Sequence, residues 1–185
     1  MSGEGASWIG AAAAGLMLLA ALSIVAASWR NGISPMPASA PVRRVVAAEV
    51  ARFGRAGRVA EAGAGWGTLA LAIARRNPGW TVTGIENSPV PWLSSVALAR
   101  AAGLTGRVRF LRGDLFKFPY EEADLVVCYL YPGAMARLSG VLRRRLAPGA
   151  RAISVCFAMP GWTPERVLTC SDAYATKVYI YTADG

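Results

Sequence analysis

The sequence predicts an α/β protein with a doubly wound, Rossmann-like parallel sheet, preceded by a separate apolar helix. Three observations lead to this prediction. From Arg58 onward, strand-like and helix-like segments alternate, a glycine-rich turn joins the first strand to the first helix of that series, and an uncharged run lies near the N-terminus. Strands that alternate with helices of these lengths are joined by right-handed crossovers, so neighbouring strands run parallel.

The apolar run extends from Trp8 to Trp29 and contains no charged side chain. At about 1.5 Å per residue, a helix of this length reaches roughly 33 Å. That length spans a hydrocarbon core of about 30 Å. We therefore expect residues 1–7 to be a short tail and residues 8–29 to be a transmembrane helix. A buried alanine-rich helix or a processed targeting segment is the alternative.

The charges that flank this run predict its orientation. A cleaved signal peptide has a basic first region, whereas the only charged side chain before the run is Glu4. Positive charge follows the run, at Arg30, Arg43 and Arg44. The positive-inside rule then predicts a single-pass membrane protein with its domain on the cytoplasmic side. The lipid bilayer is thus an expected partner.

The segment 30–40 is expected to be a linker, because NGISPMPASAP is rich in proline and serine. The stretch VRRVVAAEVARF then repeats apolar residues at helical spacing, and Pro41 can begin that helix. The domain is expected to occupy residues 41–185. Its further strands are predicted at 58–62, 81–86, 107–112, 123–129 and 150–157, and its further helices at about 67–77, 91–102 and 133–146.

Composition limits the chemistry that this domain can use. The chain has 20 Lys+Arg against 11 Asp+Glu, a formal charge of +9, which favours anionic surroundings such as lipid headgroups or nucleic acid. An arginine-rich composition without a specific polyanion is an equally good explanation. The absence of histidine excludes Ser-His-Asp triads and the usual zinc sites. The three cysteines, Cys128, Cys156 and Cys170, lie far apart, so we expect neither a disulfide framework nor a metal site.

The stretch RVAEAGAGWGTLALAIARR contains the strongest site signal, three glycines in alternate positions between a strand and a helix. Ligands of doubly wound sheets bind outside the carboxyl ends of the strands. A dinucleotide site reads GxGxxG, whereas here the later glycines are one residue closer, which disfavours a dehydrogenase. Glu86 ends the second strand, where a carboxylate can bind ribose hydroxyls. Asp114 ends the third strand, where it can meet an adenine edge.

Together these segments resemble class I S-adenosylmethionine-dependent methyltransferases. EAGAGWG is similar to their first motif, TGIE to their second and GDLF to their third. The resemblance implies seven strands, with a C-terminal hairpin at 165–170 and 176–182, and S-adenosyl-L-methionine as cofactor. It implies that the glycine loop faces the methionine part, the second motif the ribose and the third the adenine. The expected cofactor-binding residues are Glu61, Ala62, Gly63, Gly65, Gly67, Glu86, Asn87, Gly113, Asp114 and Leu115.

A narrower resemblance is to the membrane-anchored lysine methyltransferases that modify the c-subunit of ATP synthase. It rests on SPMPASAPVRRVV, on YLYPGAMARLSGVLRRRLAPGARAISVCFAMPGWTPERV and on the short tail. It implies a protein-lysine N-methyltransferase acting on a small membrane protein such as the c-subunit. Two departures are that Trp66 stands where members usually carry an acidic residue, and that Glu61 replaces the more common aspartate.

Methyl transfer from a sulfonium needs no histidine, because alignment and exclusion of water supply much of the acceleration. The candidates to orient an acceptor are Tyr129 and Tyr131, with Pro132 shaping the turn. Ordinary strand and turn aromatics are an equal alternative. Trp162 either walls the acceptor channel or covers the sheet edge. The run from Arg143 to Arg145 either complements a helix terminus or faces a membrane.

Two other functions stay open. The domain can methylate a lipid-soluble small molecule, such as a quinone or a phospholipid, or it can be a tethered binding module that has lost catalysis. A nucleic-acid methyltransferase is weaker, because the fourth strand lacks the Asn-Pro-Pro-Tyr type of motif. We therefore expect no nucleic-acid partner.

Overall fold

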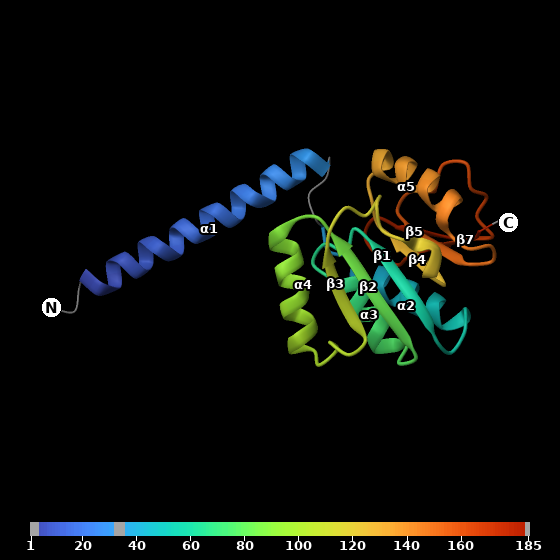
Figure 1. Ribbon diagram of the computed structural model, residues 1–185, viewed down its shortest axis with the longest axis horizontal. Coiled ribbons are helices and arrows are strands. Elements are labelled where there is room, and N and C mark those ends of the chain that lie inside the picture. Colours follow the sequence, from blue (N-terminus) through green and yellow to red (C-terminus); the bar gives the residue numbers. More distant parts are fainter. Residues whose placement is uncertain (1–3, 32–35, 184–185) are drawn as a thin grey trace. The chain divides into compact units, whose positions relative to one another are not determined.

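The computed structural model describes residues 4–31 and 36–183. The chain divides into two units, Met1–Ser34 and Pro35–Gly185. The first unit contains helix α1, Glu4–Asn31, and the second contains a seven-stranded sheet with helices on both faces (Figure 1). Residues 1–3 of the predicted tail, residues 32–35 of the predicted linker and the last two residues of the predicted domain lie outside the described residues.

Helix α1 includes the predicted transmembrane span Trp8–Trp29. Within residues 4–31 and 36–183, no helix combines the length and the apolar character that crossing a membrane requires. The predicted transmembrane helix is therefore unsupported, and the predicted single-pass membrane localisation is contradicted.

Helix α2, Ala40–Arg52, opens the second unit at the place where the sequence predicts a helix. The Ser39 hydroxyl accepts a hydrogen bond from the backbone N–H of Val42, at 3.4 Å, and so caps the helix. Pro41 lies in the first turn, where its missing N–H costs no hydrogen bond. Val46 and Val50 are fully buried, so α2 packs on the domain through its apolar stripe.

The sheet has the strand order β3-β2-β1-β4-β5-β7-β6. The first five strands in the chain pair in parallel, whereas β7 is antiparallel to both β5 and β6. This arrangement confirms the doubly wound, seven-stranded sheet and its C-terminal hairpin. The strands are β1 Gly57–Ala62, β2 Trp80–Glu86, β3 Val108–Arg112, β4 Leu125–Cys128, β5 Arg151–Val155, β6 Arg166–Thr169 and β7 Lys177–Thr182.

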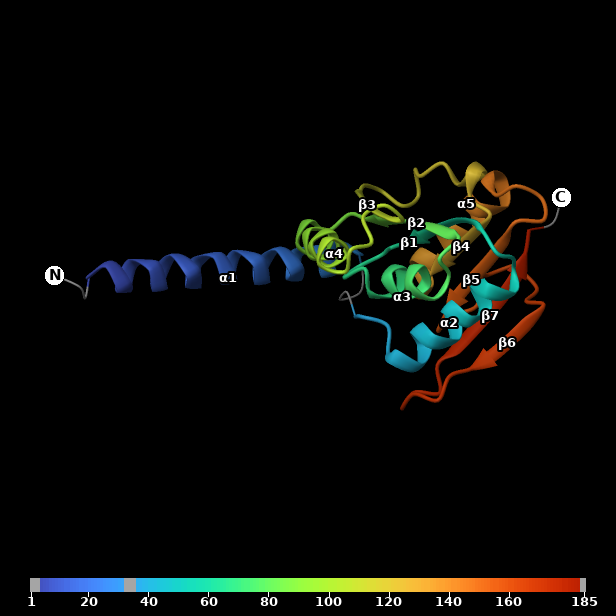
Figure 2. The same ribbon diagram turned by 90° about the horizontal axis from the view of Figure 1, so that it is seen from below.

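The helices cover the two faces of the sheet unequally. Helices α2, α3 (Thr68–Arg76) and α4 (Pro89–Ala101) share one buried cluster with the sheet, and α5 (Pro132–Arg145) belongs to another (Figure 2). On the α5 side, a short 3-10 turn, Tyr120–Glu122, connects β3 to β4. Central strands are buried on both faces, which explains their continuous apolar sequences, such as LVVC in β4.

The carboxyl ends of the parallel strands lie at one edge of the sheet, called here the carboxyl edge. Because β7 inserts in reverse between β5 and β6, the turn that joins β6 to β7 also returns to the carboxyl edge. Strand β5 ends earlier than predicted, since Cys156 has a left-handed φ of 72°. The loops of the carboxyl edge therefore come from both halves of the domain.

Candidate functional site

Three loops that carry predicted cofactor-binding residues meet at the carboxyl edge. The loop after β1 is joined to β2, because the N–H groups of Gly63 and Ala64 donate to the Ile85 carbonyl, at 3.0 and 2.9 Å. The loop after β3 is joined to β2 as well, since Gly113 N–H donates to the Glu86 carbonyl at 3.0 Å. The structure thus brings the three motif segments together along neighbouring strands.

The glycine loop explains why its glycines alternate. Gly63, Gly65 and Gly67 have φ values of 76°, 52° and 75°, a region that side chains other than glycine rarely adopt. A Cβ on Gly67 would lie 2.6 Å from the Phe110 ring. A Cβ on Gly65 would meet no atom within 4 Å. Gly67 is therefore needed for packing, whereas the backbone at Gly65 is open to an approaching ligand.

Glu61 is buried at the end of β1, and its carboxylate accepts a hydrogen bond from Ala70 N–H at 3.1 Å. Ala70 lies in the first turn of α3, where backbone N–H groups lack intrahelical partners. Glu61 thus caps α3, a task that Gly67 at the N-cap position cannot perform with a side chain. Burial raises the pKa of Glu61 to about 8, opposed by the Ala70 hydrogen bond and supported by Glu86. Neighbouring Ala62 is fully buried.

Glu86 joins the glycine loop to the end of β2. Its Oε2 accepts from Gly65 N–H at 2.8 Å, and its Oε1 accepts from Ser88 N–H at 2.7 Å. A carboxylate oxygen has two acceptor positions, so each Glu86 oxygen can still accept from a hydroxyl. Asn87 is exposed beside it, and its side-chain oxygen accepts from the Ser88 hydroxyl at 3.1 Å.

The third loop follows β3 and exposes Asp114. Asp114 Oδ1 accepts from Phe116 N–H at 2.9 Å, which forms a tight turn. Leu115 is half-buried, and its carbonyl accepts from the Tyr120 hydroxyl at 2.7 Å. Gly113 resembles Gly65 in that an added Cβ would meet no atom within 4 Å. The loop thus offers an open backbone position and an apolar side chain next to the end of β2.

The structure separates the two predicted acceptor-side tyrosines. Tyr129 packs against the buried cluster of α2 and α3, whereas Tyr131, beyond the end of β4, packs against the cluster of α5. Tyr131 is the N-cap residue of α5, and Pro132 is its exposed first residue. Of the two tyrosines, Tyr129 is the one that lies near the end of β5 and the turn that joins β6 to β7.

Sequence reasoning missed two residues beside Tyr129, namely Asp172 and Tyr174. Burial raises the pKa of Tyr129, and Cys156, Asp172 and Tyr174 raise it further by their proximity. Both missed residues lie in the turn between β6 and β7, far from Tyr129 in the sequence. No local motif marks them, because their position depends on the antiparallel insertion of β7.

Other sequence candidates have structural roles. Trp162 packs edge to face on Tyr181, with ring centroids 5.9 Å apart, among side chains on the α5 side. Arg143 donates to the Gly161 carbonyl, and Arg145 donates to the Phe118 carbonyl at 3.0 Å. These two arginines therefore hold neighbouring loops against α5, and Trp162 covers the sheet on that side.

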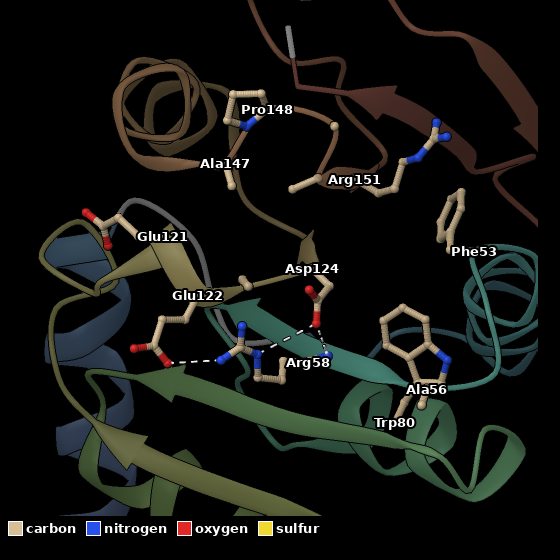
Figure 3. A pocket seen from close by; sticks show the side chains of 13 residues that line it. Phe53, Ala56, Arg58, Trp80, Glu121, Glu122, Asp124, Ala147, Pro148 and Arg151 are labelled. Carbon is tan, nitrogen blue, oxygen red and sulfur yellow. Dashed lines mark hydrogen bonds and ion pairs between the residues drawn. The ribbon is translucent and has the colours of Figure 1, made fainter. Parts of the chain in front are cut away.

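A cavity of about 610 Å³ lies at the opposite, amino edge of the sheet (Figure 3). Arg58, Trp80 and Arg151 line it near the starts of their strands. Arg58 forms ion pairs there with Glu122, at 3.1 Å, and with Asp124, at 3.7 Å. Because the motif loops lie at the carboxyl edge, this cavity is separate from the candidate site.

Comparisons with known proteins agree with this geometry. Residues 61–166 match the ANTKMT methyltransferase domain family. The human ATP synthase c-subunit lysine N-methyltransferase is 34% identical over 115 residues, which are 61% of this chain and 48% of that protein. A protein-lysine N-methyltransferase of Saccharolobus islandicus (strain REY15A) is 28% identical over 141 residues, or 76% of this chain and 86% of that protein. The chain thus spans about half the length of the human relative.

Among solved structures, an RNA methyltransferase from Salinibacter ruber in complex with S-adenosyl-L-homocysteine superposes with a TM-score of 0.73. It is 30% identical, and the match covers 80% of this chain and 94% of that one. The matching family segment begins at Glu61 and includes the three loops of the carboxyl edge. The chain therefore belongs to the ANTKMT methyltransferase domain family, and its sheet is that of a class I S-adenosylmethionine-dependent methyltransferase.

Proposed function

We propose that this domain transfers a methyl group from S-adenosylmethionine to the ε-amino group of a lysine in a protein. The observation that carries the proposal is the junction of Glu86 with Gly65, which holds an open backbone position beside a buried carboxylate at the carboxyl edge. Family membership and the lysine methyltransferases among the relatives support the choice of lysine as acceptor.

The residues present fit the cofactor. Gly65 leaves room for the methionine part, Glu86 has acceptor positions for ribose hydroxyls, and Leu115 offers an apolar side chain to the adenine. Bound in this way, the cofactor supplies a methyl group activated by a sulfonium. The half-buried Trp66 is the departure from the family pattern in this loop. Its effect on cofactor affinity is measurable with Trp66→Asp, which restores the acidic character that members usually have.

The protein's own contribution is alignment rather than proton transfer. Glu61 is one of two buried carboxyl groups of the site, but it faces α3, so it caps a helix rather than serving as a base. Tyr129 keeps its proton at neutral pH, as an ordinary phenol does, and burial raises its pKa further. Its hydroxyl can therefore orient an amine by hydrogen bonding. Alignment of this kind supplies a large share of the rate in displacement reactions.

For the acceptor we propose a small membrane protein of the type of the ATP synthase c-subunit. The support is the human relative, whose name gives that substrate, together with the sequence similarity over its matched half. The test incubates the purified protein and labelled S-adenosylmethionine with protein, lipid and RNA fractions separately. Label on a protein lysine is the expected result. Label confined to extractable lipid supports the small-molecule alternative, and absence of cofactor binding supports the inactive module.

RNA is a second candidate acceptor. The specific observation is the Salinibacter ruber structure, which matches over nearly its whole length and is described as an RNA methyltransferase. The formal charge of +9 is compatible with a polyanion. Transfer to RNA that falls steeply with added salt, with none to protein, would favour this function over lysine methylation.

A further inference from the structure

The turn between β6 and β7 closes immediately beyond the two strands. Cys170 N–H donates to the Thr176 carbonyl at 2.8 Å, and Cys156 N–H donates to the Lys177 carbonyl at 2.8 Å. Residues 171–176 therefore stand at the carboxyl edge, next to the end of β5. We call these six residues the β6–β7 turn.

Asp172 fixes the conformation of the β6–β7 turn. Its Oδ1 accepts from Thr176 N–H at 2.8 Å, and its Oδ2 accepts from the Thr176 hydroxyl at 2.7 Å and from the Ser39 hydroxyl at 3.1 Å. These hydrogen bonds hold the pKa of Asp172 below its ordinary value, and the two from Thr176 contribute most. Since Ser39 also caps α2, the turn is joined to the start of the domain. The carboxylate is therefore ionised and held in place.

Tyr174 lies in the same turn, and 85% of its surface is exposed. Phe157, which follows Cys156 at the end of β5, is also exposed, at 37%. Tyr129 directly follows β4, which pairs with β5, and β5 pairs in turn with the start of β7, so Tyr129 and the β6–β7 turn lie at neighbouring strand ends. Burial chiefly raises the pKa of Tyr129, and Asp172 is among the neighbouring groups that raise it further. An anion, an exposed ring and the candidate acceptor-side tyrosine thus gather at the carboxyl edge of a domain whose net charge is strongly positive.

We propose that the β6–β7 turn is part of the acceptor-binding surface and recognises the lysine-bearing segment of a protein substrate. Tyr174 packs against that segment, and the Asp172 carboxylate attracts the lysine ammonium towards Tyr129. This inference rests on the proposed function and names the residues that select its substrate. The charge complementarity is specific, because a carboxylate favours a cationic side chain over the anionic backbone of RNA.

Capture and transfer make different demands on the lysine. A free lysine side chain has a pKa of about 10.4, so the form that arrives at neutral pH is the ammonium. Before the transfer, the lysine ammonium must lose one proton to solvent. The nitrogen lone pair then bonds the methyl carbon, while the electron pair of the broken carbon–sulfur bond stays on sulfur. Asp172 thus acts in capture, so its loss is expected to change KM rather than kcat.

The test measures kcat and KM for purified ATP synthase c-subunit, with the affinity for S-adenosylmethionine measured by calorimetry. Tyr174→Ala is expected to raise KM for the acceptor about tenfold, as loss of an aromatic anchor does. Asp172→Asn is expected to raise KM about two- to fivefold, as removal of a charge partner at the protein surface does. Leu93→Ala and Glu122→Gln, which alter an exposed apolar and an exposed acidic side chain away from the β6–β7 turn, are the matched controls.

Salt separates recognition by charge from a structural role of the turn. In the wild type, KM is expected to rise with ionic strength, and in Asp172→Asn this dependence should flatten. Unchanged KM in both variants, or an equal loss of cofactor affinity, would overturn the inference while leaving lysine methylation intact. If the wild type transfers no methyl group to protein lysine, the proposed function itself fails.

Methylation of the enzyme's own lysines can be distinguished from methylation of the acceptor in this assay. Lys117 and Lys177 are the only lysines in the chain, and both are exposed. Lys177 directly follows the β6–β7 turn, so label on the enzyme is checked with Lys177→Arg and Lys117→Arg. The shift in KM is expected to be the same in these backgrounds.

Discussion

The carboxylate of Glu86 accepts a hydrogen bond from the backbone N–H of Gly65 at 2.8 Å. This contact joins the ends of two adjacent parallel strands and fixes the loop that leaves room for a ligand. It makes Glu86 both a binding residue and a support of the glycine loop.

Glu86→Ala is therefore expected to weaken S-adenosylmethionine binding by about 2–4 kcal/mol, since charge-assisted hydrogen bonds to hydroxyls are lost. Calorimetry measures the change, with Glu122→Ala at the amino edge as a control that should bind normally. An affinity equal to that of the wild type would remove Glu86 from the site.

The two glycines of the loop are expected to respond differently to alanine. Gly67→Ala places a methyl group 2.6 Å from Phe110 and 2.7 Å from Ser95, so the free energy of unfolding should fall by roughly 2–4 kcal/mol. Gly65→Ala meets no neighbour within 4 Å, so it should cost only about 1 kcal/mol of strain. The main expected effect of Gly65→Ala is loss of affinity for the cofactor. Denaturant titration together with calorimetry distinguishes the two, and equal unfolding losses would contradict the assignment.

Glu61 gives the domain a pH-dependent stability. Its pKa rises from 4.5 to about 8 on folding, chiefly because it is buried. Between these pH values the folded state holds more protons than the unfolded chain, so the free energy of unfolding falls as pH rises. The contribution is complete below the lower value and is lost through the upper one.

Glu61→Gln mimics the protonated group and should remove this dependence. The variant is expected to match the wild type near pH 5 and to be more stable by at least about 1 kcal/mol near pH 9. Denaturant unfolding at several pH values gives both curves. Parallel curves for the two proteins would show that Glu61 does not titrate in this range.

Tyr129 and Tyr131 form a matched pair for testing the acceptor side. Tyr129 lies beside Cys156 and the β6–β7 turn, whereas Tyr131 packs on the α5 side. Tyr129→Phe is expected to lower kcat about tenfold or more, in keeping with the loss of an orienting hydrogen bond. Tyr131→Phe should have a smaller effect, and neither variant should change cofactor affinity. A larger loss of kcat in Tyr131→Phe than in Tyr129→Phe would show that Tyr131, and not Tyr129, orients the acceptor.

The alternation of strands and helices made the parallel part of the sheet predictable from sequence. Predicted bounds differ from those observed by one or two residues, because end residues depend on local backbone geometry such as the left-handed Cys156. The glycine loop and Glu86 were found because a motif marks them. The orientation of the Glu61 side chain towards α3 was not predicted, because it depends on where the helix begins relative to the strand.

Features created by tertiary pairing were not accessible to the same reasoning. Asp172 and Tyr174 reach Tyr129 only because β7 pairs between β5 and β6. The amino-edge cavity forms from residues far apart in the sequence, such as Arg58 and Arg151. For α1 the sequence predicted too much, since its hydropathy indicated a membrane span that the described residues do not support.

The central claim is transfer of a methyl group to a protein lysine, and mass spectrometry of the acceptor tests it most directly. Purified ATP synthase c-subunit is incubated with S-adenosylmethionine and either the wild type or Glu86→Ala. The account predicts a mass increase in units of one methyl group, mapped by fragmentation to a lysine, with the wild type and much less with the variant. An unmodified lysine with the wild type, accompanied by methyl groups on RNA or lipid in parallel reactions, would contradict it.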